Sequence, residues 1–334
     1  MSALSAREVR DTGVRLTSLG YGAAQAGNLY RPTTDAETQE AVDVAWDAGV
    51  RYFDTAPHYG LGLSERRLGA SLAARPREEY VVSTKVGRLL VPSPETAHLT
   101  DPDMFDVPAD VRREWDFSRD GVLRSLEASL ERTGLDRVDV VYLHDPDDHE
   151  EQAFAEAVPA LVELREQGVV GAIGAGMNQS AMLARFVAEA DVDVVMCAGR
   201  FTLLEQPALT DLLPAAAARG AAVVVAGVYN SGLLARDVVP DDATYDYAQA
   251  PLALLDRTRR IAAACAEHGV TLPQAALAYV RTHPAVASTV VGLRTADQVR
   301  QAVERHAAVV PADLWTDLVD QGLLAPDAHP DVFA

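Results

Sequence analysis

Short apolar runs rich in β-branched residues alternate along the chain with amphipathic or alanine-rich stretches. The runs have the length of strands, and the stretches between them repeat their apolar positions with helical spacing. The pattern predicts eight strands, at 18–24, 51–55, 80–86, 139–144, 170–176, 192–199, 221–228 and 287–293. It predicts helices between and after them at 34–49, 118–134, 150–167, 180–190, 207–219, 251–268 and 295–308, and one more that begins at Ser64.

Several helix ends carry sequence signals. Thr34 and Glu37 have the spacing of a capping box, in which each side chain bonds the backbone of the other residue. Ser64 stands at an N-cap position, and Gly134 is a typical helix stop. These signals mark the starts of two predicted helices and the end of a third.

Strands that are apolar on both faces, each followed by a helix, indicate parallel strands covered by helices. Eight such units in 334 residues predict a single (β/α)8 TIM barrel domain over residues 1–334. A doubly wound sheet is the alternative, but neither "GYGAAQAGN" nor "GLGLSERRLG" fits the G-x-G-x-x-G turn typical of it. Two extended runs around Asp11, Thr12 and Gly13 predict an N-terminal β-hairpin that closes the bottom of the barrel.

A long loop is expected after the third strand. Residues 89–115 hold four prolines and show no regular periodicity. Loops of this length in a compact domain are usually functional or disordered.

Composition narrows the class of protein. The formal net charge is −20, which disfavours nucleic acids and anionic membranes as partners. The two cysteines, Cys197 and Cys265, fit no metal-ligand spacing and are expected to be reduced thiols. The first ten residues lack the apolar core of a signal peptide, and the longest apolar run is too short to span a membrane. We therefore expect a cytoplasmic protein that acts on a small molecule.

Four chemically distinct side chains stand at or just beyond the ends of neighbouring strands. Asp54 ends the second strand, Tyr59 follows five residues later, Lys85 lies on the third strand, and His144 ends the fourth. Each alone has an ordinary structural explanation, such as a cap, a packed ring or a surface charge. Because the carboxyl ends of barrel strands meet at one face, the four together predict an active site.

The chemistry of this set is proton transfer. A tyrosine has a pKa of about 10, and a neighbouring ammonium group lowers it. Asp54 can keep Lys85 charged, and His144 can donate a hydrogen bond to a substrate oxygen. The set has neither a nucleophile nor a metal cage, so it favours carbonyl–alcohol interconversion with a hydride-carrying cofactor. A metal-dependent hydrolase using Asp54, His58, His144 and Asp145 would leave Lys85 and Tyr59 without a role, and no metal site is expected.

The motifs "DTAPHYG" followed by "SE", Lys85, "VYLHDPD" and "VVGLRTADQV" resemble those of the aldo/keto reductase family, over nearly the whole chain. The resemblance implies a TIM barrel that uses NAD(P)(H). It implies Tyr59 as proton donor or acceptor, Lys85 and Asp54 as the pair that tunes it, and His144 as the group that orients the substrate. Asn178 would contact the nicotinamide carboxamide.

Two longer strings narrow the resemblance. The segment 115–148 and the pair "AGRFTLLEQ" and "AGVYNSGLLA" resemble aldose 1-dehydrogenases acting on L-fucose and D-threo-aldoses, and also pyridoxal 4-dehydrogenase. Both groups oxidise a cyclic hemiacetal to a lactone, with Tyr59 then the general base. A general NAD(P)H-dependent carbonyl reductase and a non-catalytic nucleotide-sensing subunit are the alternatives.

The resemblance also carries expectations for the cofactor. Ala198 stands where many relatives have Gln, and Val228 or Tyr229 must replace the Tyr that stacks on the nicotinamide. Relatives that prefer NADP carry Lys and Arg at the eighth strand and the following helix, where this chain has Gly292 and Gln298. Only Arg294 remains nearby, so NAD is expected as the preferred cofactor, with NADP possible.

Other cofactor contacts follow from the same resemblance. The backbone N–H groups of Ser231, Gly232 and Leu233 would bind the pyrophosphate, and Gln298 would close a capping box at Thr295. The full expected cofactor set is Gly22, Ala23, Asp54, Asn178, Tyr229, Ser231, Gly232, Leu233, Gly292, Arg294, Gln298 and Gln301. The residues expected to line the substrate pocket are Gln25, His58, Trp115 and Phe201, with Tyr229 beside them.

Overall fold

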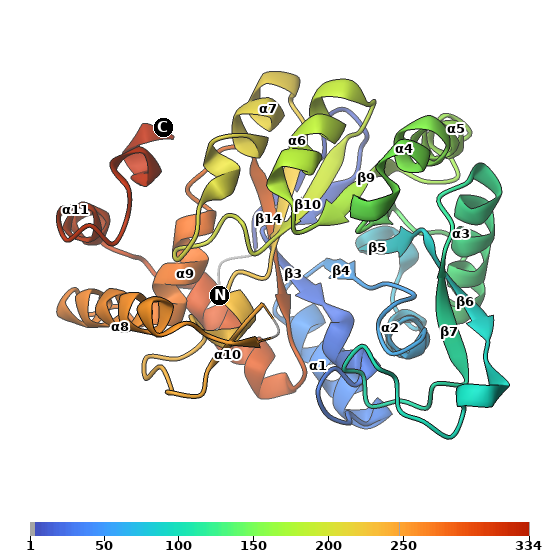
Figure 1. The fold of residues 1–334 in the computed structure, drawn as a ribbon, viewed down its shortest axis with the longest axis horizontal. Coiled ribbons are helices and arrows are strands. Elements are labelled where there is room, and N and C mark those ends of the chain that lie inside the picture. The colour runs from blue at the N-terminus through green and yellow to red at the C-terminus, as the bar shows by residue number, and fades with distance from the viewer. Residues whose placement is uncertain (1–3, 247, 334) are drawn as a thin grey trace.

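The fold is an eight-stranded parallel barrel surrounded by helices (Figure 1). The computed structural model describes residues 4–246 and 248–333. Neighbouring strands around the barrel are β3, β4, β5, β8, β9, β10, β11 and β14, and the last pairs with the first. Their bounds are Leu19–Gly22, Tyr52–Asp54, Val81–Val86, Val140–His144, Ala172–Met177, Val194–Ala198, Ala222–Ala226 and Val286–Gly292. The predicted barrel and all eight predicted strands are confirmed.

The helices form the outer layer. In chain order α1 to α7 are Asp35–Asp47, Leu63–Leu72, Arg119–Thr133, Glu150–Gln152, Val158–Glu166, Ser180–Glu189 and Leu212–Arg219. A π-helical turn, Ala153–Ala157, joins α4 to α5. The last four, α8 to α11, are Leu252–Glu267, Leu272–Val280, Ala296–Ala307 and Ala312–Asp320. The pattern did not predict α9 and α11.

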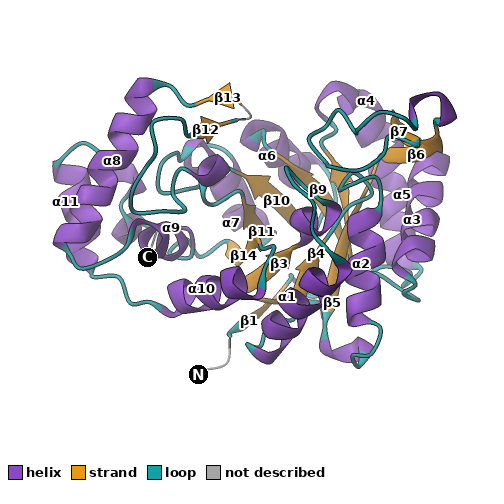
Figure 2. Ribbon diagram, turned by 90° about the horizontal axis from the view of Figure 1, so that it is seen from below, coloured by secondary structure: helices purple, strands orange, loops and turns teal. Residues whose placement is uncertain are grey.

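The reasons for these two omissions differ. Helix α9 is buried almost all round, so its sequence shows no polar face, although Thr271 and Gln274 form a capping box at its start. Helix α11 is amphipathic but follows the eighth strand–helix unit, where a barrel requires no further helix. It lies against α8, at the opposite end of the molecule from β6 and β7 (Figures 1 and 2).

Two of the predicted helix ends are confirmed. The Thr34 hydroxyl accepts the Glu37 N–H at 3.1 Å, and Glu37 accepts the Thr34 N–H at 2.7 Å. Gly134 ends α3 with a φ of +66°, a left-handed conformation that glycine adopts without steric cost.

Two other cap assignments require correction. The N-cap of α2 is Gly62 rather than Ser64, because the buried Ser64 hydroxyl donates to the Ala23 carbonyl at 2.7 Å. At α10 the Thr295 hydroxyl accepts the Gln298 N–H at 3.3 Å, as expected. The Gln298 side chain, however, accepts the N–H of Arg294 at 2.8 Å, so the second half of the predicted box is shifted by one residue.

The N-terminal hairpin is confirmed. Strands β1, Ala6–Glu8, and β2, Arg15–Thr17, pair in antiparallel fashion. Val9, Val14 and Leu16 are buried and pack with side chains from inside the barrel, including Tyr52 and Val140. These contacts close the end of the barrel opposite the carboxyl ends of its strands.

The segment after the third barrel strand is a folded ribbon rather than a loop. Strands β6, Arg88–Pro92, and β7, Val111–Trp115, are antiparallel, and the register pairs Arg88 with Trp115 and Pro92 with Val111. Prolines sit at the strand end and in the connection, where they interrupt no ladder bond and also hide the strand pattern. A second short pair, β12 (Thr244–Tyr245) and β13 (Ala248–Gln249), follows β11. Among the described residues, no helix is long and apolar enough to cross a membrane.

Candidate active site

Asp54, Tyr59, Lys85 and His144 lie together at the carboxyl ends of β4, β5 and β8. The Lys85 ammonium group donates to both carboxylate oxygens of Asp54, at 2.8 and 3.0 Å, and to the Tyr59 hydroxyl at 3.0 Å. The rings of Tyr59 and His144 meet edge to face, with centroids 5.9 Å apart. The structure thus brings together the four side chains that the sequence placed at neighbouring strand ends.

Local packing fixes this arrangement. Lys85 also donates to the Thr55 carbonyl at 2.9 Å, and Asp54 accepts the Ser83 hydroxyl at 2.7 Å. The loop that carries Tyr59 touches the backbone of the 3₁₀ turn Ala23–Gly27. A Cβ at Gly60 would lie 2.2 Å from the Gly27 carbonyl oxygen, and Gly60 has a φ of +62°. Only glycine fits there, and this close approach positions the neighbouring tyrosine.

Electrostatics keeps Lys85 charged. Complete burial by itself would lower the pKa of Lys85, but the Asp54 carboxylate and Tyr59 raise it further than burial lowers it, so that pKa is raised overall. Lys85 is therefore an ammonium ion at neutral pH, with its charge balanced by Asp54.

Tyr59 holds its proton tightly. Burial raises the pKa of Tyr59, Lys85 lowers it, and Asp54 raises it again, with a net rise above 10.0. The sequence argument had the direction of the Lys85 effect right, but burial outweighs it. Since the Tyr59 oxygen accepts a hydrogen bond from Lys85, its own O–H is free to point at a substrate oxygen.

His144 is an uncharged ring facing the pocket. Burial, followed by the charges of Arg88 and Lys85, holds the pKa of His144 well below its usual value. Its Nδ1 is buried and has no hydrogen-bond partner among the described residues. Its Nε2 lies 3.7 Å from an Asp145 oxygen, which is beyond hydrogen-bonding distance. A neutral imidazole with this free capacity can bind an oxygen atom of a substrate.

A small pocket of about 230 Å³ surrounds these groups and suits a small-molecule substrate. Its polar wall includes His58 and Asn178, and its floor carries the small residues Gly176, Ala198 and Ala226. It adjoins a wider outer cleft of about 1180 Å³, bounded largely by the β6–β7 ribbon, with which it shares His58, Asp103, Met104, Asp145 and Asn178.

The expected substrate residues are only partly brought to the pocket. His58 lines both the pocket and the outer cleft, whereas Trp115 lines the outer cleft alone. Gln25 lies against Gly292, away from the pocket. Phe201 is fully buried against Tyr279, with centroids 5.4 Å apart, so its expected role in substrate binding is not supported. It follows β10 but turns toward α9, a direction that the sequence does not reveal.

Four expected cofactor residues line a second cavity of about 290 Å³ beside α10. They are Tyr229, Gly292, Gln298 and Gln301. Tyr229 is therefore not placed to stack on a nicotinamide in the catalytic pocket, where Ala198 and Ala226 lie instead. The cavity is also lined by Arg236 and Arg305, two cations that the sequence argument did not consider.

The Arg294 side chain is bound to the loop at 29–33. Its guanidinium donates to the Arg31 carbonyl at 2.9 Å and also bonds Thr33 and the Leu29 carbonyl. It is buried and lines neither cavity. The expected contact of this side chain with a cofactor is therefore not supported.

The loop expected to wrap a pyrophosphate is a 3₁₀ turn, Asn230–Gly232. Gly232 donates its N–H to the Tyr229 carbonyl at 2.9 Å, and Leu233 donates to Asn230 at 3.1 Å. Two of the three expected N–H donors are thus engaged within the turn, which leaves Ser231 as the candidate.

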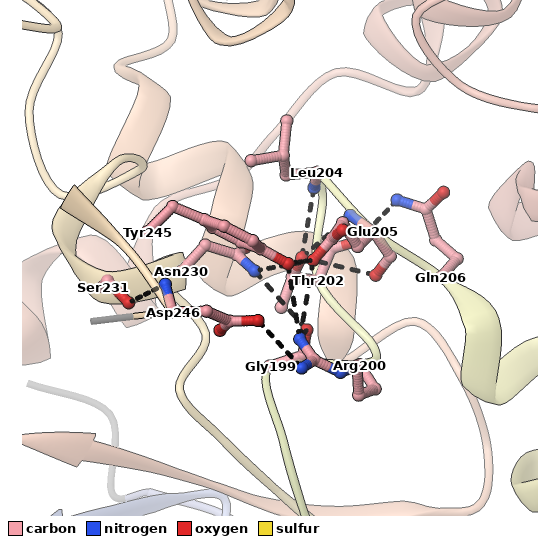
Figure 3. A network of polar contacts seen from close by, with 10 residues as sticks. All are labelled: Gly199, Arg200, Thr202, Leu204, Glu205, Gln206, Asn230, Ser231, Tyr245 and Asp246. Carbon is pink, nitrogen blue, oxygen red and sulfur yellow. Dashed lines mark hydrogen bonds and ion pairs between the residues drawn. The ribbon is translucent and has the colours of Figure 1, made fainter. Parts of the chain in front are cut away.

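A polar network fixes the same turn to β12 and to the loop after β10 (Figure 3). The Ser231 hydroxyl accepts the Asp246 N–H at 3.2 Å, and Arg200 pairs with Asp246 at 3.0 Å. Tyr245 donates to Glu205, which also accepts the Asn230 amide at 3.4 Å. The network therefore restrains the turn from two sides.

Gly22 and Ala23 form part of the buried barrel rim. A Cβ at Gly22 would lie 3.1 Å from the Val291 carbonyl oxygen, and the Ala23 carbonyl accepts the Ser64 hydroxyl. Neither residue lines the two cavities. Within the described part of the chain, no group of three or more His, Cys, Asp or Glu side chains is arranged to hold a metal ion.

The outer cleft has a charged wall that the sequence pattern does not predict. Arg88 contacts His58 and Asp145, and Arg113 pairs with Asp101 at 2.6 Å. Arg88 stands three residues beyond Lys85, a visible signal of a charge near the site. Its partners depend on the β6–β7 ribbon, which the sequence pattern did not predict.

Comparisons with known proteins identify the class. The aldo/keto reductase family profile matches residues 18–319, and the chain belongs to this family. It is an oxidoreductase of a family whose members use nicotinamide cofactors and act on small molecules.

Particular relatives are close in sequence. The chain is 51% identical to a D-threo-aldose 1-dehydrogenase of a Pseudomonas species, over 93% of this chain and 96% of the relative. It is 37% identical to a pyridoxal 4-dehydrogenase of Microbacterium luteolum, over 97% of this chain and 99% of the relative. Among solved structures, a glycerol dehydrogenase of Gluconobacter oxydans superposes with a TM-score of 0.78 at 21% identity, over 97% and 95% of the two chains, which supports the fold.

Proposed function

We propose that the protein oxidises an aldose of the L-fucose or D-threo-aldose type at its anomeric carbon, converting the cyclic hemiacetal to a lactone with NAD. The observation that carries the chemistry is the hydrogen-bonded chain from Asp54 through Lys85 to Tyr59, beside a neutral His144. The substrate class rests on the 51% identity to a D-threo-aldose 1-dehydrogenase. We also propose that residues 1–334 form one domain that acts in the cytoplasm.

Each group has a defined task in this reaction. His144 and the Tyr59 hydroxyl bind the anomeric hydroxyl, and Tyr59, as a phenolate, removes its proton. Lys85 stabilises that phenolate by its charge, and Asp54 holds Lys85 in place. When bound, oxidised NAD supplies the acceptor for the hydride that leaves the anomeric carbon. The hemiacetal thereby loses one hydride and one proton and becomes a lactone.

We assign the two cavities to the two ends of a dinucleotide. Small side chains at Gly176, Ala198 and Ala226 leave room for a flat ring beside Tyr59, and Asn178 lines the same pocket for a carboxamide. The cavity beside α10 gathers Gln298 and Gln301 for the adenosine end. We propose NAD over NADP because Gly292 and Gln298 stand where relatives that prefer NADP carry Lys and Arg, and because Arg294 is occupied by Leu29, Arg31 and Thr33. Arg236 and Arg305 line the same cavity and are the cations that a 2′-phosphate would have to use instead.

The substrate is tested by measuring NADH formation with L-fucose, D-arabinose and pyridoxal, with NAD and NADP in parallel. We expect turnover of the aldoses with NAD and a lactone as the product. Turnover of pyridoxal alone would favour the second candidate, which the 37% identity to pyridoxal 4-dehydrogenase supports. Tight binding of NADH without turnover of any substrate would contradict the proposal and indicate a nucleotide-sensing subunit.

The rate of aldose oxidation should rise with pH. Burial raises the pKa of Tyr59 above 10.0, so at neutral pH only a small fraction of the protein carries the phenolate that acts as base. Below that pKa, each added pH unit increases this fraction about tenfold. We therefore expect kcat/KM for oxidation to increase from neutral to alkaline pH, and the reverse reduction to slow over the same range. A profile that falls with pH would exclude Tyr59 as the general base.

A further inference from the structure

Arg88, the first residue of β6, bridges two residues of the catalytic pocket from outside it. Its guanidinium lies 3.1 Å from the Nδ1 of His58 and forms an ion pair with Asp145. It also lies over the Trp115 ring, with 4.3 Å between its Cζ and the ring centroid. Arg88 lines the outer cleft but not the catalytic pocket, whereas His58 and Asp145 line both.

The two partners of Arg88 both border His144. The His58 and His144 rings meet edge to face with centroids 5.5 Å apart, and the Asp145 carboxylate lies 3.7 Å from the Nε2 of His144. Asp145 has a φ of +43°, and its N–H donates to the Gly176 carbonyl at 3.0 Å. The backbone therefore holds this carboxylate beside the imidazole.

We propose that Arg88 is a positioning residue of the active site: by pairing with Asp145 and holding His58, it prevents the Asp145 carboxylate from stabilising a protonated His144, so that the ring stays neutral and free to bind the substrate oxygen. The proposal deepens the proposed function and rests on the role of His144 given there.

The charges around His144 support this assignment. The groups that face it from neighbouring elements are His58 and Tyr59 after β4, Lys85 on β5, Arg88 on β6, Arg113 on β7 and Asp145 after β8. Asp145 is the one carboxylate in this set, and Arg88 pairs with it directly. Arg113 is bound to Asp101 and Asp103, at 2.6 and 3.0 Å, and Lys85 to Asp54. Arg88 therefore acts on His144 in two ways, directly through its own charge and indirectly by pairing with Asp145.

Removal of Arg88 reverses the balance. A buried carboxylate close to an imidazole stabilises the imidazolium form and raises its pKa. Protonated His144 would be a second acid beside Tyr59 and could no longer accept a proton or a hydrogen bond. The planar guanidinium of Arg88 contacts His58 and Asp145 at the same time through different nitrogen atoms. The single ammonium group of a lysine does not reproduce this geometry.

The test follows the histidine directly and requires no turnover. The protonation of His144 is measured by NMR of ¹⁵N-histidine-labelled protein. The pH is varied from about 4 to about 9, a range that extends to both sides of the ordinary histidine pKa. Signals are assigned with His58→Gln and His144→Gln. The compared proteins are the parent, Arg88→Met, Arg88→Lys, Arg88→Met/Asp145→Asn and Arg112→Met. Arg112 lies on the same ribbon and, among the described residues, forms an ion pair only with exposed Glu114, at 3.3 Å, so Arg112→Met is the matched control.

We expect His144 to stay neutral throughout this range in the parent and in Arg112→Met. In Arg88→Met the protonated form of His144 should appear at the acidic end of this range, and removal of the carboxylate in the double variant should reverse the part of this change that comes from Asp145. Arg88→Lys should cause a smaller change than Arg88→Met. In proteins that turn over an aldose, the acidic limb of kcat/KM should move with the NMR titration.

Two results would overturn the proposal. One is a His144 that stays neutral down to about pH 4 in a folded Arg88→Met protein, as in the parent, with thermal unfolding as the check of folding. The other is a change that is equally large in the double variant, since it would come from the lost charge of Arg88 and not from Asp145. If Arg88→Met does not fold, the protonation of His144 is compared between Arg88→Lys and the double variant, and this comparison tests the proposal. Failure of the substrate assignment alone would leave the NMR result intact, so the two failures are distinguishable.

Discussion

Tyr59→Phe should lower kcat for aldose oxidation by at least about 100-fold, while the affinity for NADH stays within about twofold of the parent. The hydroxyl that accepts from Lys85 at 3.0 Å is the only atom removed, and it is the proposed proton acceptor. The nicotinamide pocket keeps its shape because the ring remains. The measurements are steady-state kinetics with saturating NAD and NADH binding followed by fluorescence.

The matched control for this variant is Tyr279→Phe. This variant also loses one buried hydrogen bond, to the Ala328 carbonyl at 2.9 Å, but Tyr279 lies on α9 and lines neither the catalytic pocket nor the cavity beside α10. Its kcat should remain near that of the parent. A near-normal rate for Tyr59→Phe, or an equal loss in both variants, would remove Tyr59 from its proposed role.

The catalytic set could be predicted because its geometry follows from topology. In a parallel barrel, strand ends share one face, so Asp54, Lys85 and His144 converge whatever the details of the loops. Tyr59 is reached by a short loop whose path is fixed by the contact of Gly60 with Gly27. Features of this kind can be predicted from the sequence without knowing how distant segments pack.

The rest of the site depends on contacts that sequence patterns do not carry. Phe201 and Arg294 follow barrel strands as the sequence predicts, but their side chains point away from the expected sites. Phe201 packs against Tyr279 on α9, and Arg294 bonds the loop at 29–33. Arg88 gains its role from the β6–β7 register, in which it faces Trp115. Such choices of partner are settled by packing between segments far apart in sequence.

Lys85→Met should both inactivate the protein and destabilise it by about 3–5 kcal/mol, because it leaves the buried Asp54 carboxylate without its cation. The side chains of Lys85 and Asp54 are 3% and 4% exposed, so water cannot replace the lost partner. Equilibrium unfolding in urea measures the change in the free energy of unfolding, and aldose oxidation measures the change in kcat.

The double variant Asp54→Asn/Lys85→Met separates the two effects. It contains no buried charge at this position, so most of the lost stability should return, whereas activity should stay at least about 100-fold below the parent because Tyr59 still lacks its cation. Arg132→Met is the control, since it breaks the buried pair with Glu65, 2.5 Å long, outside the catalytic pocket. It should lose stability but keep kcat. Recovery of activity in the double variant would show that Lys85 acts only by neutralising Asp54, and that Tyr59 needs no ammonium group to work.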